Sequence, residues 1–269
     1  MATEIHPSAM VHPDADLGVD VKIGACSIVE AHVRIGDRTR VDPFVLVKAF
    51  TSMGAENHIH SNVCVGGEPQ DLKFKGEETR LEIGDRNVVR EFVTLHRGTG
   101  HGGGVTRIGS ECLLMAYVHV AHDCTLGNHV ILSNAVMLGG HVEADDHAIV
   151  GAMTGIHQFV RIGEHAFVGA MSGIGQDVPP YTLATGVRAK LRGLNLIGLR
   201  RGGFSNELIS TLKKSYMLLW RSGMERREAL DEVERNFSGF PEVRKLVDFV
   251  RAGTRGITHV ASKNGENQE

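Results

Sequence analysis

The sequence is poor in aromatic residues and lacks any long hydrophobic run. Phe, Trp and Tyr supply 5% of its 269 residues, although hydrophobic residues together reach 42%. Because a membrane-spanning helix needs about 20 consecutive and mostly apolar residues, no membrane span is expected. The first ten residues, MATEIHPSAM, have neither a basic nor an apolar stretch, so no secretory signal is predicted.

Cysteine is also scarce, and its spacing argues against two classes of small fold. The four cysteines are Cys26, Cys64, Cys112 and Cys124, and no two of them form a C-x-x-C pair. Zinc ribbons and disulfide frameworks depend on such cysteine patterns, so neither is expected. We therefore predict a cytoplasmic protein in a reducing environment.

The charge is small overall but unevenly distributed. The formal net charge is −3, yet residues 188–255 carry a surplus of seven positive charges. A basic segment of this kind fits an acidic partner or phosphate groups, and it equally fits a solvated helical surface. Charge alone leaves both interpretations open.

The dominant feature is a repeat of six residues. From Ile5 onward each unit begins with an aliphatic residue, and small or β-branched residues recur at its fifth place. The repeat is interrupted at residues 71–82, after which it resumes in phase, and again at residues 101–107. It then runs unbroken from Ile108 to Pro179. Such a period is the signature of a solenoid built from stacked units.

The repeat has a direct structural interpretation. Six residues make one short extended side and one corner, where Gly, Asp or Asn take unusual backbone angles. Three sides close a triangular coil of 18 residues, with the first and fifth positions pointing inward. Coils then stack about 4.8 Å apart, like strands of a parallel sheet. Cys112 and Cys124 occupy inward fifth positions, so we predict that they fill the core and are not nucleophiles.

The hexapeptide pattern resembles that of the hexapeptide-repeat proteins. Their fold is a left-handed parallel β-helix, so the resemblance implies a mainly β protein of this class. The handedness comes from the resemblance alone, because crossovers between parallel strands are usually right-handed.

After the repeat ends, the pattern becomes helical. Leu208, Leu212, Tyr216 and Leu219 follow helical spacing, and two later segments do the same. The predicted organisation is a β-helix over residues 1–187 with loop insertions near 71–82 and 101–107, a helical domain over 188–255, and a disordered tail over 256–269.

Stacking brings polar residues of the stretch VHVAHDCTLGNHV, residues 118–130, beside later ones. Adding 18 to His122 gives Gly140, and adding 36 gives Gln158, so these three are predicted to share one column. In the next column His141 lies one coil from Asp123. His119 and His157 are close to these columns in sequence. For the remaining corner histidines we expect simple exposure to solvent: His12, His32, His58, His60, His129, His147 and His165.

Two chemistries suit this strip of residues. An imidazole can act as a general base, and the Gly140 amide can stabilise an oxyanion, which together make an acyl-transfer site. Alternatively, three imidazoles with an open position make a hydrolytic zinc site, as in the β-helical carbonic anhydrases. A non-catalytic β-helical binding module is a third possibility.

The interruptions of the repeat carry a more specific resemblance. QDLKF (residues 70–74), LHRGT (95–99) and AHDC (121–124), followed by HQFVRIG, GQDVPPY and RRGGFS, are similar in order and spacing to the UDP-N-acetylglucosamine O-acyltransferase family. This resemblance covers nearly the whole chain. It implies a cytoplasmic homotrimer with active sites between subunits. It also implies transfer of an (R)-3-hydroxyacyl chain from acyl carrier protein to the 3-hydroxyl of UDP-N-acetylglucosamine, the first step of lipid A biosynthesis.

The same resemblance implies roles for individual residues. His122 matches the general base, Asp123 its supporting carboxylate and Gly140 the oxyanion amide. The implied substrate-binding residues are Asp71, Lys73, His119, His141, His157, Gln158, Asn195 and Arg201. No metal or soluble cofactor is implied, because the acyl chain arrives on the phosphopantetheine of the carrier, and no nucleic acid partner is expected.

Three positions depart from the family's usual pattern. Ile197 replaces an acidic residue, and Gly202 replaces a second basic residue, both near the implied nucleotide site. Ala170, followed by Met171, occupies the position that limits acyl length. Because each buried CH₂ contributes about 0.8 kcal/mol, a side chain at the end of an apolar groove shortens the preferred chain. Ala170 therefore predicts a slightly shorter acyl chain than glycine would.

Overall fold

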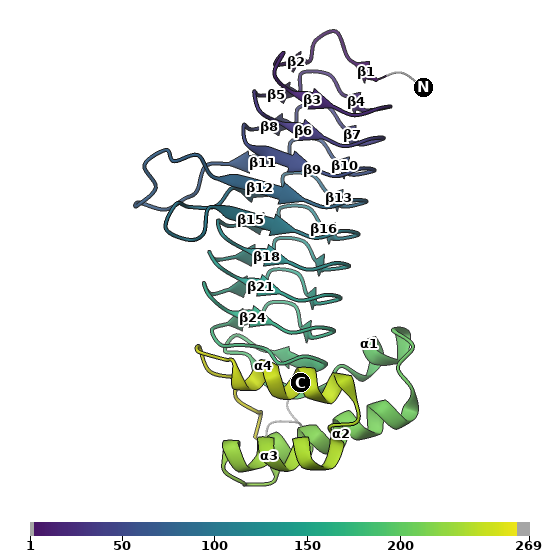
Figure 1. The fold of residues 1–269 in the computed structure, drawn as a ribbon, viewed down its shortest axis with the longest axis vertical. Coiled ribbons are helices and arrows are strands. Elements are labelled where there is room, and N and C mark those ends of the chain that lie inside the picture. The colour runs from purple at the N-terminus through teal and green to yellow at the C-terminus, as the bar shows by residue number, and fades with distance from the viewer. Residues whose placement is uncertain (1–2, 263–269) are drawn as a thin grey trace.

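The computed structural model describes residues 3–262, which form a long three-sided prism with helices at its C-terminal end (Figure 1). Each side of the prism is one sheet. The first sheet contains β1 (Glu4–Ile5), β4 (Lys22–Ile23), β7 (Arg40–Val41), β10 (His58–Ile59), β13 (Val88–Val89), β16 (Leu113–Leu114), β19 (Ile131–Leu132), β22 (Ile149–Val150), β25 (Phe167–Val168), β27 (Thr182–Thr185) and β28 (Lys190–Leu194). The second contains β2 (Met10–Val11), β5 (Ile28–Val29), β8 (Leu46–Val47), β11 (Cys64–Gly67), β14 (Thr94–His96), β17 (His119–Val120), β20 (Met137–Leu138), β23 (Gly155–Ile156) and β26 (Gly173–Ile174). The third contains β3 (Asp16–Leu17), β6 (Arg34–Ile35), β9 (Thr51–Met53), β12 (Arg80–Ile83), β15 (Val105–Ile108), β18 (Thr125–Leu126), β21 (Glu143–Ala144) and β24 (Arg161–Ile162).

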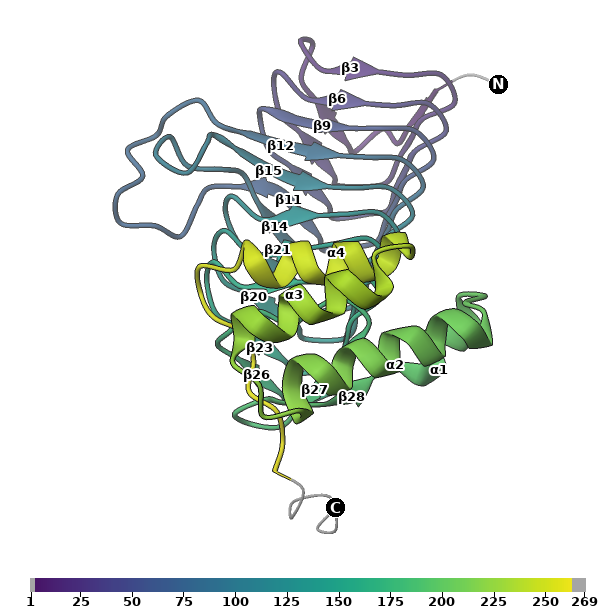
Figure 2. The ribbon, with the colours of Figure 1, turned by 60° about the horizontal axis from the view of Figure 1, so that its bottom comes forward.

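The strand register confirms the predicted stacking. Glu4 pairs with Lys22 and His119 with Met137, both in parallel. Contacts between neighbouring coils therefore span 18 residues, and the span rises to 30 and then 25 where the two insertions occur. The inserted loops, residues 68–79 and 97–104, project together from one edge of the prism (Figure 2).

The core is a narrow apolar column that the first and fifth positions of each repeat fill. Val41, Val47 and Ile59 represent the first position and Val33 the fifth, and each of them is 1% exposed or less. Cys112 and Cys124 are buried among them, as predicted. Burial raises the pKa of the Cys112 thiol to about 11, so this thiol stays protonated and unreactive at neutral pH.

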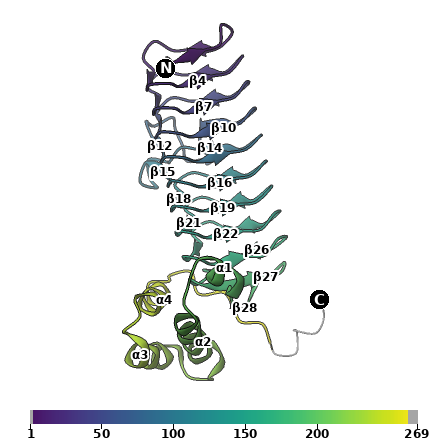
Figure 3. The same cartoon turned by 90° about the vertical axis from the view of Figure 1, so that its right-hand side faces the viewer.

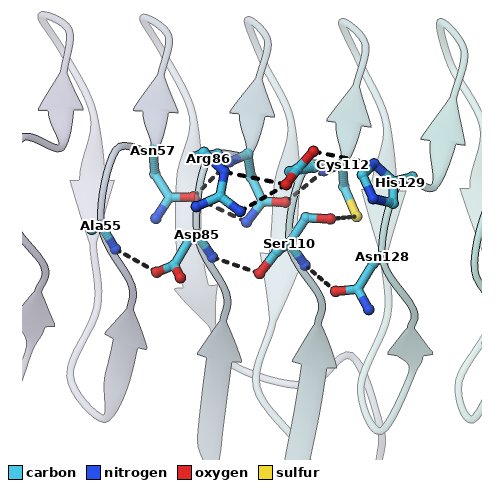
Figure 4. A network of polar contacts seen from close by, with 10 residues as sticks. Ala55, Asn57, Asp85, Arg86, Ser110, Cys112, Asn128 and His129 are labelled. Carbon is cyan, nitrogen blue, oxygen red and sulfur yellow. Dashed lines mark hydrogen bonds and ion pairs between the residues drawn. The ribbon is translucent and has the colours of Figure 1, made fainter.

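Buried amides tie neighbouring coils together at the corner between the third and first sheets (Figure 4). The Asn57 side-chain oxygen accepts hydrogen bonds from the backbone and side chain of Asn87, at 2.9 and 3.0 Å. Asn87 in turn accepts one from the Cys112 amide at 2.8 Å. Because both amides are partnered, they occupy inward fifth positions without a desolvation penalty.

The corners differ from the expectation that Gly, Asp or Asn would take the unusual backbone angles. Most are occupied by other residue types with positive φ, including Phe44 at 62°, His141 at 60° and Met153 at 55°. A left-handed residue costs about 1–2 kcal/mol. The corner amide offsets much of this cost, because it donates to the preceding coil, as from His141 to the His122 carbonyl at 3.0 Å.

Among the described residues, four helices follow the prism: α1 (Leu196–Arg201), α2 (Asn206–Arg221), α3 (Arg226–Phe237) and α4 (Pro241–Arg251). They pack against its C-terminal end (Figures 1 and 3). The Arg161 guanidinium fixes α4 there by contacting Asp177 at 2.7 Å and the Phe249 carbonyl at 2.8 Å. No helix within residues 3–262 is long and apolar enough to cross a membrane.

The C-terminal boundaries differ from the predicted ones. β28 continues the first sheet beyond residue 187 by pairing antiparallel with β27. Residues 256–262, which were predicted to be disordered, return to the prism, where Ile257 bridges to Asp177 and Val260 to Leu191. Ile257 is buried, and this apolar anchor holds the segment in place. The rest of the predicted tail, 263–269, lies outside the described residues.

Candidate active site

His122 and Asp123 lie at the corner between the second and third sheets, between β17 and β18. The Asp123 side chain is 1% exposed and receives three hydrogen bonds. These come from the Thr99 amide at 2.9 Å, the Thr99 hydroxyl at 2.7 Å and His122 Nδ1 at 2.8 Å. Because an ionised carboxylate only accepts, Nδ1 carries the imidazole proton and Nε2 keeps a free lone pair.

The second inserted loop closes the site over Asp123. A Cβ atom at Gly102 would lie 2.2 Å from Asp123 Oδ2 and 2.6 Å from His141 Cε1, so only glycine permits this approach. Thr99 and Gly102 were not predicted as site residues. Thr99 ends the LHRGT motif, and that motif was the available signal.

Gly140 lies directly against the His122 ring. A Cβ at Gly140 would be 2.5 Å from His122 Cε1 and 2.8 Å from Nε2. The Gly140 amide donates a hydrogen bond to no residue within 3–262. The Gly140 backbone therefore lies beside the His122 ring, as the stacking of 18-residue coils predicted. The roles of general base and oxyanion donor stay predictions.

Other predicted histidines surround this pair. The His141 ring meets His122 edge-on at 5.3 Å and stacks on Phe159 at 4.4 Å. His119 Nδ1 is 2.7 Å from the Thr94 hydroxyl. Burial is the main cause that lowers the pKa of both His119 and His141, so both are mostly neutral near pH 7.

A cleft of about 900 Å³ runs from these residues along the second sheet towards the helices. Its lining includes the predicted site residues His119, His122, Gly140, His157 and Gln158. Its floor includes the register-matched column Met137, Gly155 and Gly173, so the lower coils have no side chain there. The far end carries Arg188 and Lys190. The cleft thus combines imidazoles at one end, basic side chains at the other, and between them a column without side chains that Gln158 and Gln176 flank.

The first inserted loop places Asp71 near the cleft. Its carboxylate is 3.2 Å from His101 Nε2 on the second loop. It also accepts the Lys73 amide at 2.8 Å, and this bond is the main cause that lowers the pKa of Asp71. The Lys73 side chain is exposed.

Four predicted site residues lie elsewhere in the single chain. Asn195 caps α1 by accepting the Gly198 amide at 3.0 Å, and it donates to the His165 carbonyl at 3.0 Å. Arg201 is exposed at the end of α1, and Ala170 and Met171 lie at the corner between the first and second sheets. Within residues 3–262, none of these four lines the cleft.

The zinc hypothesis can be compared with the donor atoms present. His122, Asp123 and His141 offer ligand atoms within 4.8 Å of one another. This set has two imidazoles and one carboxylate where three imidazoles were predicted, a composition that zinc accepts, but both Asp123 oxygens already accept hydrogen bonds from Thr99. The geometry therefore favours the general-base interpretation.

Comparison with known proteins decides between the families. The model of UDP-N-acetylglucosamine O-acyltransferase domain 2 matches residues 177–258, and that of the bacterial transferase hexapeptide matches 106–140. The curated acyl-[acyl-carrier-protein]–UDP-N-acetylglucosamine O-acyltransferase of Thermodesulfovibrio yellowstonii is 46% identical over 94% of this chain and 98% of its own length. The chain belongs to the UDP-N-acetylglucosamine O-acyltransferase family.

Solved structures of this family agree. LpxA from Acinetobacter baumannii is 42% identical with a TM-score of 0.93, and the alignment covers 95% of this chain and 99% of that one. LpxA from Moraxella catarrhalis is 41% identical with a TM-score of 0.92 over the same shares. The predicted left-handed parallel β-helix with a C-terminal helical part is confirmed.

Proposed function

We propose that this chain transfers an (R)-3-hydroxyacyl group from acyl carrier protein to the 3-hydroxyl of UDP-N-acetylglucosamine, the first step of lipid A biosynthesis. The observation that carries this proposal is the His122 imidazole, which contacts Asp123 and lies against the Gly140 backbone in the lining of a long cleft. Family membership identifies the two substrates.

The reaction needs no nucleophilic side chain. The sugar hydroxyl gives its proton to His122 Nε2 while its oxygen bonds to the thioester carbonyl carbon. The Gly140 amide donates to the oxyanion that forms. When the carbonyl re-forms, the carbon–sulfur bond breaks and the departing thiolate of the carrier takes the proton from the imidazolium. Asp123 holds the Nδ1 proton throughout and stabilises the imidazolium.

The remaining predicted residues have roles around this centre. Asp71, Lys73, His119, His141, His157 and Gln158 bind the substrates. The side-chain-free column at Gly155 and Gly173 suits an extended acyl chain. The donor supplies its own phosphopantetheine thioester, so the proposal involves no metal or soluble cofactor in the transfer. The basic segment 188–255 suits the acidic carrier, because complementary charge accelerates encounter.

A homotrimer completes the site in this proposal. Large apolar side chains are exposed along the corner between the first and second sheets, where Phe92 and Tyr117 stack at 5.1 Å near Met153 and Met171. An exposed apolar row of this kind suits a protein interface. A neighbouring subunit would then bring Asn195, Arg201, Ala170 and Met171 to the cleft, and the assembly would work in the cytoplasm.

The proposed reaction is tested by incubating the protein with UDP-N-acetylglucosamine and a ladder of (R)-3-hydroxyacyl carriers, with mass spectrometry of the nucleotide. We expect one hydroxyacyl group per product molecule, attached at the 3-oxygen as located by NMR. Replacing Ala170 with glycine is expected to move the preferred length upward. If no carrier of any length yields acylated nucleotide, the proposal is wrong.

Gly102→Ala tests whether the inserted loop supports the general base. The added Cβ displaces the loop from Asp123, which weakens the Thr99 hydrogen bonds to a charged group. Because such a bond contributes about 1.5–3 kcal/mol, we expect kcat/KM to fall roughly 10- to 100-fold. The matched control is Gly100→Ala in the same loop, whose Cβ would meet Glu77 at an ordinary 3.4 Å. Equal activity of the two variants would show that the loop does not position Asp123.

A further inference from the structure

A second group of metal-ligating side chains lies near the N-terminal end, away from the cleft. Asp42 follows β7, and His58 and His60 belong to the next coil, on and just after β10. Simple solvent exposure was expected for the corner histidines, and it holds for His12, His32, His129 and His147. That expectation is wrong for His165, whose side chain is 15% exposed. It is also wrong for His58 and His60, because both are partly buried against the Asp42 carboxylate.

The register explains why these three side chains meet. Arg40 pairs with His58 and Val41 with Ile59, so Asp42 stacks one coil from His60. His58 and His60 are two residues apart on an extended segment, and their side chains therefore share a face. Both imidazoles approach one oxygen, Asp42 Oδ2, at 3.0 Å from His58 Nε2 and 3.5 Å from His60 Nδ1.

We propose that Asp42, His58 and His60 bind one divalent transition-metal ion of the zinc class. Zinc bonds of about 2.0–2.1 Å in a tetrahedron place neighbouring ligand atoms roughly 3.3 Å apart. The two nitrogen–oxygen distances lie on either side of that value, and all three ligand atoms lie within 4.8 Å of one another. Two imidazoles and one carboxylate form a common zinc-binding set.

The surroundings of Asp42 suit a ligand that binds through one oxygen. Arg40 Nε donates to Asp42 Oδ1 at 2.7 Å, which orients the carboxylate and leaves Oδ2 to the imidazoles. Glu91 Oε1 lies 3.7 Å from His60 Nδ1, but it accepts a hydrogen bond from Arg90 at 3.2 Å, so the proposed site has three protein ligands and an open fourth position. In the single chain the Asp42, His58 and His60 side chains are 13%, 32% and 20% exposed.

The two histidine rings stack at a centroid distance of 3.9 Å and an interplanar angle of 26°. An ion between their nitrogens requires both ring planes to point towards it. Rotation about the χ2 torsions achieves this, because that torsion has a broad energy minimum in histidine. We therefore expect ion binding to splay the stacked pair.

The other histidine–carboxylate group of the chain is less suited to an ion. Asp123 Oδ2 already accepts from both the Thr99 hydroxyl and His122 Nδ1, and Gly102 presses against it. In contrast, only the two imidazoles contact Asp42 Oδ2 within residues 3–262. A bound ion would link the coils of β7 and β10, and its role would be to stabilise the N-terminal half of the prism independently of the transfer reaction.

The test is isothermal titration of Zn²⁺ into the full-length, tag-free, chelator-treated protein, with metal content measured by mass spectrometry after dialysis. We expect one ion per chain, and a rise in the thermal unfolding midpoint upon binding. His58→Ala, His60→Ala and the isosteric Asp42→Asn should each weaken binding at least tenfold. With Co²⁺ as the probe, visible absorption bands should appear in the wild type and be lost in the same variants.

The controls are His147→Ala, an exposed corner histidine, and His122→Ala in the other candidate group. Both should bind Zn²⁺ as the wild type does, and circular dichroism verifies that every variant is folded. The proposal is overturned if the wild type shows no saturable binding. It is equally overturned if folded His60→Ala and Asp42→Asn bind as tightly as the wild type, or if binding is lost in His122→Ala instead.

Discussion

Replacing His122 with alanine is expected to lower kcat by about 10²–10⁴-fold, the range for loss of a general base. The imidazole is the group whose free nitrogen faces the Gly140 backbone, and its other nitrogen is committed to Asp123. Removing it takes away both the proton acceptor and the proton source for the leaving thiolate. The measurement is kcat with UDP-N-acetylglucosamine and the preferred acyl carrier.

The structure provides a matched control for this variant. His147 is exposed and stacks between His129 and His165, at centroid distances of 4.6 and 4.5 Å, on a different corner of the prism. His147→Ala should keep wild-type kcat. If folded His122→Ala retained more than about a tenth of the wild-type rate, His122 would not be the general base.

Gly140→Ala is expected to cause a second large loss, of about 10²-fold or more in kcat/KM. The alanine keeps the backbone N–H, so the oxyanion donor itself remains. Its Cβ, however, would lie 2.5 Å from His122 Cε1, so either the ring or the backbone must move. A displacement of about 1 Å at a reacting centre costs on the order of 10²-fold in rate. The variant therefore separates the geometry of the pair from its chemistry.

Gly175→Ala is the appropriate comparison, because Gly175 lines the same cleft and no atom within 4 Å would meet its Cβ. We expect nearly unchanged kinetics for it. A crystal structure of Gly140→Ala should show a shifted His122 ring. Wild-type activity in Gly140→Ala would mean that the ring and the amide do not act together.

The sequence predicted the parts of this molecule that depend on its period. A fixed coil of 18 residues was enough to place Gly140 beside His122 and His141 beside Asp123, because the register is constant from Ile108 onward. The inward positions of Cys112 and Cys124 followed from the same rule. A periodic backbone lets local sequence determine position in space, which few other folds allow.

What the period does not govern was not predicted from sequence. Thr99 and Gly102 reach Asp123 because a loop folds back over the corner, and loop conformation carries no repeat signal. The corner residues were predicted wrongly, because hydrogen bonds between coils outweigh local backbone preference. Residues 256–262 were predicted as part of the tail that ends in the polar stretch ASKNGENQE, although Ile257 anchors them to the prism.

Direct transfer by one imidazole beside one backbone amide can be tested by intact-protein mass spectrometry after mixing the protein with acyl carrier alone. We expect an unmodified protein mass without the sugar nucleotide, and acylated nucleotide as soon as the sugar nucleotide is added. A stoichiometric acyl adduct on this chain, formed and consumed at the rate of turnover, would contradict direct transfer.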